Sequence, residues 1–141
     1  MSDPATQARS VVVERDLPHP PEKVWRALTQ PQLIAEWLMR TDFVAPTPDH
    51  RFTLSGDWGA VACKVVEVEP HRTLAYTWDA FGLESVVTWT LTPIGTPPGA
   101  GTRLRLEQAG FRPDQAQFHQ GAEASWPGFL AKLEQVLARL D

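Results

Sequence analysis

The alternation of apolar and polar residues predicts strands at the start of the chain and across its middle. Residues 11–17 read VVVERDL and are followed by a proline, a pattern typical of a strand. The segment 46–70 is expected to form a hairpin of two strands. Residues 71–81, 84–93 and 102–111 alternate as well, which places their large apolar side chains on one face. Strands of this kind fit an antiparallel sheet with one apolar face and one solvated face.

Apolar residues at helical spacing predict three helices. The stretch PPEKVWRALTQPQLIAEWL, residues 20–38, contains Pro31 in its middle, so we expect two short helices that each begin near a proline. Residues 114–140 predict a long C-terminal helix with Asp114 as its N-cap. Pro127 lies inside this segment and predicts a kink or a fresh start there. Because the two short helices are too short to be stable alone, they must pack on a large apolar surface.

The order of these elements predicts an α+β fold. An apolar sheet face must be covered, and the C-terminal helix is the only predicted element long enough to cover it. We therefore expect a curved antiparallel sheet wrapped around that helix, with a pocket between them and the two short helices closing one end. Residues 1–9 are expected to form a flexible tail and residues 10–141 a single domain, a common domain size.

Composition narrows the range of partners and compartments. The 141 residues include 13 Lys and Arg against 17 Asp and Glu, a net charge of −4, which argues against nucleic acid or an anionic membrane as a partner. No apolar run approaches the ~20 residues that span a bilayer, and the N-terminus lacks the apolar region of a signal peptide. The single cysteine, Cys63, excludes an internal disulfide and fits a cytoplasmic location.

The sequence offers little catalytic or metal-binding chemistry. It lacks the nucleophile-elbow, zinc-protease, paired-cysteine and phosphate-loop motifs. Its four histidines are scattered, with no i, i+4 pair, so neither a metal nor another cofactor is expected; they are His19, His50, His71 and His119. Cys63 lies on a predicted strand without an adjacent histidine and is interpreted as a packing residue. These observations favour a binding protein over an enzyme.

Eight side chains are candidates to line the expected pocket. They are the rings of Trp37, Tyr76, Trp78, Trp89 and Trp126 and the polar groups of Arg15, Gln108 and His119. Large rings with a few polar groups are what a small apolar ligand requires, although the same rings can fill a solid core.

Two of the polar candidates have alternatives. Arg15 is in phase with Val11 and Leu17, so an inward-facing Arg15 would need an anionic ligand or a carboxylate partner. The candidate carboxylates are Asp79, Glu84 and Glu107. The alternative is that the other face of this strand points inward and Arg15 is solvated. His119, seven residues before Trp126, would hydrogen-bond a ligand if it faces the pocket, and is otherwise a surface histidine.

Several segments resemble a known family. They are LPHPPEKVWRALTQPQLIAEWL, VVEVEPHRTLAYTW, VVTWTLTP, GTRLRLEQAGF and the final helix. Together they resemble the activator of heat-shock protein 90 ATPase homologue family, which belongs to the START-like, birch-pollen-allergen-like superfamily. The resemblance covers residues 11–140 and implies the helix-grip fold with an internal cavity. The eponymous activator also uses a separate N-terminal domain, for which this chain has no room, so direct stimulation of the chaperone's ATPase is not expected.

Three functions follow from the residues and the resemblance together. The first is non-catalytic binding of a small hydrophobic or amphipathic ligand in the cavity. The second is an interaction module, linked to the stress response, that docks a chaperone or another protein through Trp58, a ring expected to be exposed in the turn at residues 55–59. The third is a cyclase or hydrolase acting in the cavity, which would need a positioned acid–base pair.

Overall fold

The computed structural model of the protein describes residues 9–96 and 100–140. The elements in chain order are β1 (Arg9–Leu17), α1 (Pro21–Thr29), α2 (Pro31–Trp37), β2 (Arg40–Thr41), β3 (Arg51–Gly56), β4 (Gly59–Glu69), β5 (Thr73–Ala80), β6 (Leu83–Ile94), β7 (Gly101–Phe111), the 3-10 turn η2 (Pro113–Gln115) and α3 (Ala116–Arg139). This order confirms the predicted α+β arrangement. The predicted tail lies outside the described residues except for Arg9, which begins β1.

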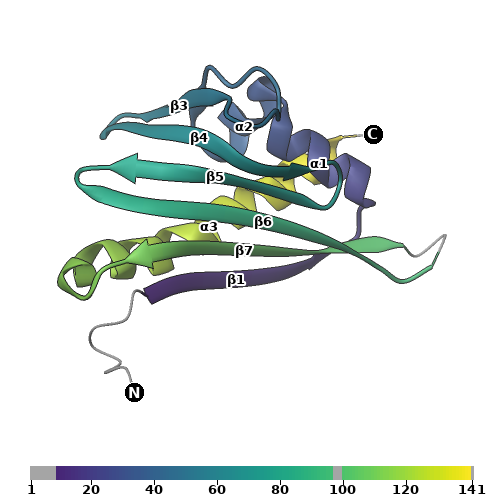
Figure 1. Ribbon diagram of the computed structural model, residues 1–141. Helices are drawn as coiled ribbons and strands as arrows, with labels where there is room; N and C mark the ends of the chain where they lie inside the picture. Colours follow the sequence, from purple (N-terminus) through teal and green to yellow (C-terminus); the bar gives the residue numbers. More distant parts are fainter. Residues whose placement is uncertain (1–8, 97–99, 141) are drawn as a thin grey trace.

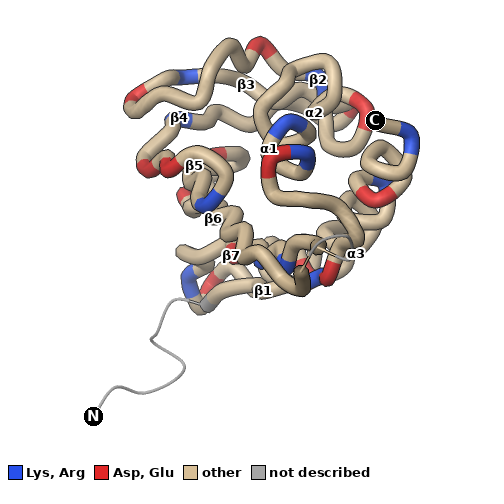
Figure 2. The backbone as a smooth tube through the Cα atoms, turned by 90° about the vertical axis from the view of Figure 1, so that its right-hand side faces the viewer, with Lys and Arg blue, Asp and Glu red and all other residues tan. Residues whose placement is uncertain are grey.

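Within the described residues, seven strands join one antiparallel sheet, in the order β1-β7-β6-β5-β4-β3-β2. The pairing of β1 with β7 joins the first and last strands along the chain at one end of the sheet. Figure 1 shows α3 crossing one face of the sheet obliquely, with α1 and α2 at one end. Seen along the strands in Figure 2, the sheet forms an arc whose hollow side holds the helices. The predicted curved sheet around a C-terminal helix is therefore confirmed.

Strand alternation sorts the side chains of the sheet between its two faces. In β6, Val87, Trp89 and Leu91 are buried, whereas the threonines between them are at least partly exposed. On the solvated face, the guanidinium of Arg103 in β7 pairs with the Asp16 carboxylate of β1 at 2.8 Å. The apolar face is therefore the one covered by the helices, as expected of a one-sided sheet.

Prolines set the beginnings of both short helices. Pro21 is the first residue of α1 and Pro31 the first of α2, where a missing backbone N–H costs no helical hydrogen bond. At the end of α2 the Trp37 indole N–H donates to the Ala27 carbonyl of α1, with 2.8 Å between nitrogen and oxygen. The Trp37 ring also meets the Trp89 ring of β6 edge-on, with centroids 5.5 Å apart. Trp37 therefore ties the two helices to each other and to the sheet.

The start of α3 differs from the prediction. Residues Pro113–Gln115 form η2, so Asp114 lies inside this turn instead of capping the helix, and its carboxylate pairs with the Arg112 side chain at 3.2 Å. The Gln115 side chain accepts a hydrogen bond from the Arg112 backbone N–H at 2.9 Å. From Ala116, α3 continues through Pro127 without a fresh start. Within the described ranges, no helix combines the length and apolar character needed to cross a membrane.

Cys63 and Tyr76 are buried ionisable groups on neighbouring strands of the core. Burial, with smaller effects of Asp79 and Asp42, raises the pKa of the Cys63 thiol to about 12. Burial also raises the pKa of Tyr76, whose hydroxyl accepts a hydrogen bond from the Trp89 indole N–H at 3.0 Å. Both groups therefore stay protonated in the folded protein at pH values where the unfolded chain ionises them.

The raised pKa values predict a loss of stability in alkali. Above about pH 9 the unfolded state loses the Cys63 proton and the folded state keeps it, so the free energy of unfolding should fall by about 1.4 kcal/mol per pH unit, with Tyr76 adding to the slope above about pH 10. Urea unfolding between pH 7 and 10.5 measures this slope. Cys63→Ala should remove the part that begins near pH 9, and identical slopes in both proteins would contradict the assignment.

Candidate functional site

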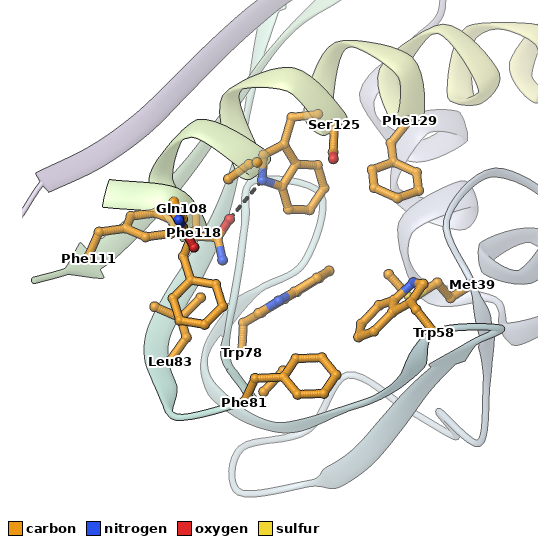
Figure 3. A pocket seen from close by; sticks show the side chains of 15 residues that line it. Met39, Trp58, Trp78, Phe81, Leu83, Gln108, Phe111, Phe118, Ser125 and Phe129 are labelled. Atoms are coloured by element: carbon orange, nitrogen blue, oxygen red, sulfur yellow. Dashed lines mark hydrogen bonds between the residues drawn. The ribbon is translucent and has the colours of Figure 1, made fainter. Parts of the chain in front are cut away.

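A pocket of about 260 Å³ lies where the β3–β4 turn, the β5–β6 turn and the first half of α3 meet, between the sheet and the long helix (Figure 3). We call it the aromatic pocket. Its lining residues are Met39, Trp58, Trp78, Ala80, Phe81, Leu83, Gln108, Phe111, Gln117, Phe118, Gly121, Ala122, Ser125, Trp126 and Phe129. Most of these are aromatic or aliphatic, which suits an apolar ligand.

Two indoles from opposite layers form the inner wall of the aromatic pocket. Trp78 comes from β5 and Trp126 from α3, and their ring centroids are 5.3 Å apart. Trp126 also meets Trp89 of the core edge-on at 5.6 Å, and Phe129 one helical turn later at 5.6 Å. Because Trp126 is only 2% exposed and touches rings on several sides, its orientation is fixed by packing.

A chain of buried hydrogen bonds connects α3 to three strands beside this wall. The Trp126 indole N–H donates to Gln108 Oε1 at 2.8 Å, and Gln108 Nε2 donates to Ser85 Oγ at 3.0 Å. The Ser85 hydroxyl in turn donates to the Trp78 carbonyl oxygen at 2.9 Å. We call these four residues the Gln108 relay. It satisfies polar groups that would otherwise be costly to bury and holds the helix at one position on the sheet.

The rim of the aromatic pocket carries exposed rings. Trp58 from the β3–β4 turn is 51% exposed, Phe81 from the β5–β6 turn 68%, and Phe118 from α3 36%. The Trp58 and Phe81 rings contact each other with centroids 5.7 Å apart. Trp58 also lies over Gly56, where an added Cβ would come within 2.8 Å of the indole nitrogen. Large exposed rings gathered at one place make this rim a candidate binding region.

Electrostatically the aromatic pocket is neutral. Among the described residues that line it, none is acidic, basic or a histidine. The part of the chain that the structure describes also contains no group of His, Cys, Asp and Glu placed to hold a metal ion. An ionic ligand would lose its hydration here without gaining an opposite charge, so the site suits neutral molecules.

Three of the eight predicted pocket residues line the aromatic pocket, namely Trp78, Gln108 and Trp126. Trp58, predicted as a partner surface, is exposed as expected and lies on the rim. Ligand binding by these four residues stays a prediction.

Three of the other predicted rings belong to the core, which corrects their placement. Trp37, Tyr76 and Trp89 are each 5% exposed or less. Their polar atoms are satisfied inside the protein, by the Ala27 carbonyl for Trp37 and by each other for Tyr76 and Trp89. The void beside Trp37 and Tyr76 measures about 10 Å³, which is too small for a ligand. These rings therefore fill the space between sheet and helices.

Arg15 is also outside the aromatic pocket. It shares the side of β1 that buries Val11 and Leu17, as its phase indicated, but it is partly exposed. Its guanidinium donates to the backbone oxygen of Glu14 at 2.8 Å. Within the described residues it makes no ion pair with the predicted candidates, Asp79, Glu84 and Glu107. Because β1 is an edge strand, the long side chain reaches solvent around the side of the sheet.

His119 faces β1 instead of the aromatic pocket. Its Nδ1 lies 2.8 Å from the Glu123 carboxylate and its Nε2 lies 3.0 Å from the Ser10 carbonyl oxygen. Its ring meets Phe111 edge-on at 5.3 Å. The helical spacing between His119 and Trp126 had suggested that both face the pocket. This was wrong because α3 crosses the sheet obliquely (Figure 1), so one face of the helix meets different strands along its length. His119 attaches the first turns of α3 to the edge of the sheet.

Of the eight predicted pocket residues, only Trp126 lies on the helical side of the site, although Phe118 and Phe129 belong to the same group of large rings in the sequence. Phe118, Ala122, Ser125 and Phe129 follow one another at intervals of four, three and four residues, a helical stripe visible in the sequence alone. Phe81, like Trp58, is a large ring next to a glycine in a turn, and this sequence pattern could have indicated an exposed ring at both positions. Residues such as Met39 carry no comparable signal, because only the packing of α2 brings them to the pocket.

The comparisons with known proteins agree with this geometry. The family described as Activator of Hsp90 ATPase homolog 1-like protein matches residues 18–138. Protein MLL2253 from Mesorhizobium loti is 57% identical over 94% of this chain and 99% of that one, with a TM-score of 0.86. CalU16 from Micromonospora echinospora is 26% identical over 99% and 82% of the two chains, with a TM-score of 0.79.

More distant similarity concerns the fold alone. The structure of the Aha1 dimer from Colwellia psychrerythraea is 16% identical over 92% of this chain and 96% of that one, with a TM-score of 0.77. The search of curated proteins finds no match. Since the family match covers most of the strands and all three helices, the chain belongs to the family of Activator of Hsp90 ATPase homolog 1-like proteins and has a START-like helix-grip fold.

Proposed function

We propose that the protein binds a small, neutral, hydrophobic or amphipathic molecule in the aromatic pocket, without chemistry. The observation that carries this proposal is the pocket itself, about 260 Å³ lined by aromatic rings and free of charged side chains among the described residues. A helix-grip family fits such a role. Burial of apolar surface would supply most of the binding free energy, at about 25 cal/mol per Å², and ring contacts would add to it.

The size of the pocket limits the ligand. Its volume is about 260 Å³. Pockets for drug-sized ligands usually measure roughly 300–1,000 Å³. We therefore expect either a compact molecule of a few fused rings or a longer one whose outer part extends past the rim at Trp58, Phe81 and Phe118.

A pair of matched probes tests this function. N-phenyl-1-naphthylamine is neutral, and its 8-sulfonate carries in addition one sulfonate group with its negative charge. The neutral probe should bind at a single saturable site with a Kd in the micromolar range, on the order of −8 kcal/mol, seen as a rise and blue shift of its fluorescence. The sulfonate should bind about tenfold more weakly or worse, because the pocket offers no cation to pair with it. Absence of saturable binding of the neutral probe would refute the proposal.

The alternative of an interaction module uses the same rim. The exposed ring of Trp58 favours docking of a chaperone or another protein, but its position at the mouth of the aromatic pocket accounts for its exposure equally well. Trp58→Ala separates the two functions. If the variant keeps its affinity for N-phenyl-1-naphthylamine and loses association with a purified chaperone, the interaction module is favoured.

A cyclase or hydrolase gains no support from the geometry. General acid–base catalysis needs titratable groups within hydrogen-bond reach of the reacting atoms. Among the described residues, those that line the aromatic pocket are apolar, amide or hydroxyl side chains.

We also propose a cytoplasmic location, which the buried, unpaired thiol of Cys63 supports.

A further inference from the structure

The Gln108 relay has a single direction, because both of its ends are chemically fixed. The Trp126 indole N–H can only donate a hydrogen bond, and the Trp78 backbone carbonyl can only accept one. The amide oxygen of Gln108 must therefore face Trp126, and its nitrogen must face Ser85. The Ser85 hydroxyl uses its own hydrogen on the Trp78 carbonyl, so it can only accept from Gln108. If the amide were turned over, the Gln108 N–H groups would face the Trp126 indole N–H, and two donors would meet without an acceptor.

This direction leaves one hydrogen-bond donor unused. The Gln108 amide nitrogen carries two hydrogens, and the relay uses one of them on Ser85. Gln108 is 2% exposed and lines the aromatic pocket, so it is a buried polar group of the lining. In Figure 3 a dashed line marks the hydrogen bond that the Gln108 amide oxygen accepts from the Trp126 indole. The amide oxygen keeps a second lone pair but lies against the Trp126 indole, so we expect the spare N–H of the amide to be the group that meets a ligand.

We infer that the aromatic pocket selects neutral, planar aromatic compounds whose inner end carries a hydrogen-bond acceptor, such as a ring ketone or a quinone, and that Gln108 Nε2 is the donor that selects them. This inference rests on the proposed function, since it names the class of ligand for the same pocket. An acceptor reaching Gln108 gains a hydrogen bond in a water-poor site, whereas a ligand without one leaves a buried N–H unused. A carboxylate acceptor is disfavoured because no cation lines the described pocket.

Three tricyclic compounds of nearly the same shape test the inference. 9-Fluorenone carries an acceptor, fluorene carries no hydrogen-bonding group, and carbazole carries an N–H donor. Each is titrated against the full-length protein by displacement of N-phenyl-1-naphthylamine. Fluorenone should bind about three- to tenfold more tightly than fluorene, the range expected for one hydrogen bond, and carbazole should bind no more tightly than fluorene.

The variant Gln108→Met tests whether Gln108 causes the preference for fluorenone over fluorene. Methionine keeps the length of the side chain and removes the N–H, so fluorenone and fluorene should bind this variant equally. The variant also leaves the Trp126 indole without its acceptor, and its folding is checked by urea unfolding. If it does not fold, the wild-type ranking of the three compounds alone decides the inference.

The outcomes separate this inference from the function on which it rests. Failure of N-phenyl-1-naphthylamine to bind would refute ligand binding itself. If the probe binds and none of the three tricyclic compounds displaces it, the inference is overturned. Equal affinities for fluorenone and fluorene, tightest binding of carbazole, or a fluorenone preference that survives in Gln108→Met would overturn the inference and leave the proposed function standing.

Discussion

Gly121→Leu is expected to weaken binding of N-phenyl-1-naphthylamine by about 30-fold, equal to about 2 kcal/mol, because overpacking a filled site typically costs about 1–3 kcal/mol. Gly121 lies on α3 and lines the aromatic pocket, and an added Cβ there meets no atom within 4 Å. The first atom of a larger side chain therefore fits without a clash, and we expect the rest of a leucine to occupy part of the pocket that this residue lines. Titration of the probe against wild type and variant measures the effect.

Gly128→Leu is the matched control for this prediction. Gly128 is also on α3, its Cβ would likewise meet no atom within 4 Å, and it does not line the pocket. Both substitutions replace a helical glycine by a better helix former, which stabilises a helix by about 0.5–1 kcal/mol. Loss of binding in Gly121→Leu alone thus cannot be ascribed to unfolding. Unchanged binding in Gly121→Leu would place the probe outside the aromatic pocket.

Trp37→Ala is expected to lower the free energy of unfolding by about 3–5 kcal/mol, the usual cost of removing a fully buried tryptophan. The substitution removes the edge contact with Trp89, leaves the Ala27 carbonyl without its donor, and opens a cavity next to the existing small void. For a domain whose whole stability is roughly 5–15 kcal/mol this is a large share. Urea unfolding at pH 7 measures the change.

Trp58→Ala is the control for this second prediction. It removes the same side chain from a position that is 51% exposed, so stability should change by about 1 kcal/mol or less. A similar loss in both variants would mean that Trp58 is part of the core. A small loss in Trp37→Ala would contradict its role as the residue that ties α1 and α2 to the sheet.

Much of the fold could be predicted because strands and helices leave local periodic patterns. Alternation in β6 identified Val87, Trp89 and Leu91 as the buried face, and prolines located the starts of both short helices. The start of α3 was harder to predict. Asp114 suits an N-cap by its residue type, but Asp114 and Gln115 both hydrogen-bond Arg112 in the 3-10 turn, and the helical period of the sequence does not reveal these bonds.

The candidate site could be predicted only in part. Trp78, Trp89 and Trp126 are all large, buried and in phase with their elements, so sequence patterns treat them alike. Trp78 and Trp126 border the aromatic pocket, whereas Trp89 is enclosed by the rings of Trp37 and Trp126. His119 shows the same problem, because its direction depends on the angle at which α3 crosses the sheet.

The sequence by itself thus determined most of the elements, the faces they bury and a net charge that argues against nucleic acid or an anionic membrane as a partner. Periodicity and composition carry this information because each depends on neighbours along the chain and on the solvent. Only the tertiary structure decided which buried rings border empty space and which way the Gln108 amide points. Both depend on contacts between residues that are far apart in sequence, such as Gln108 with Ser85 and Trp126.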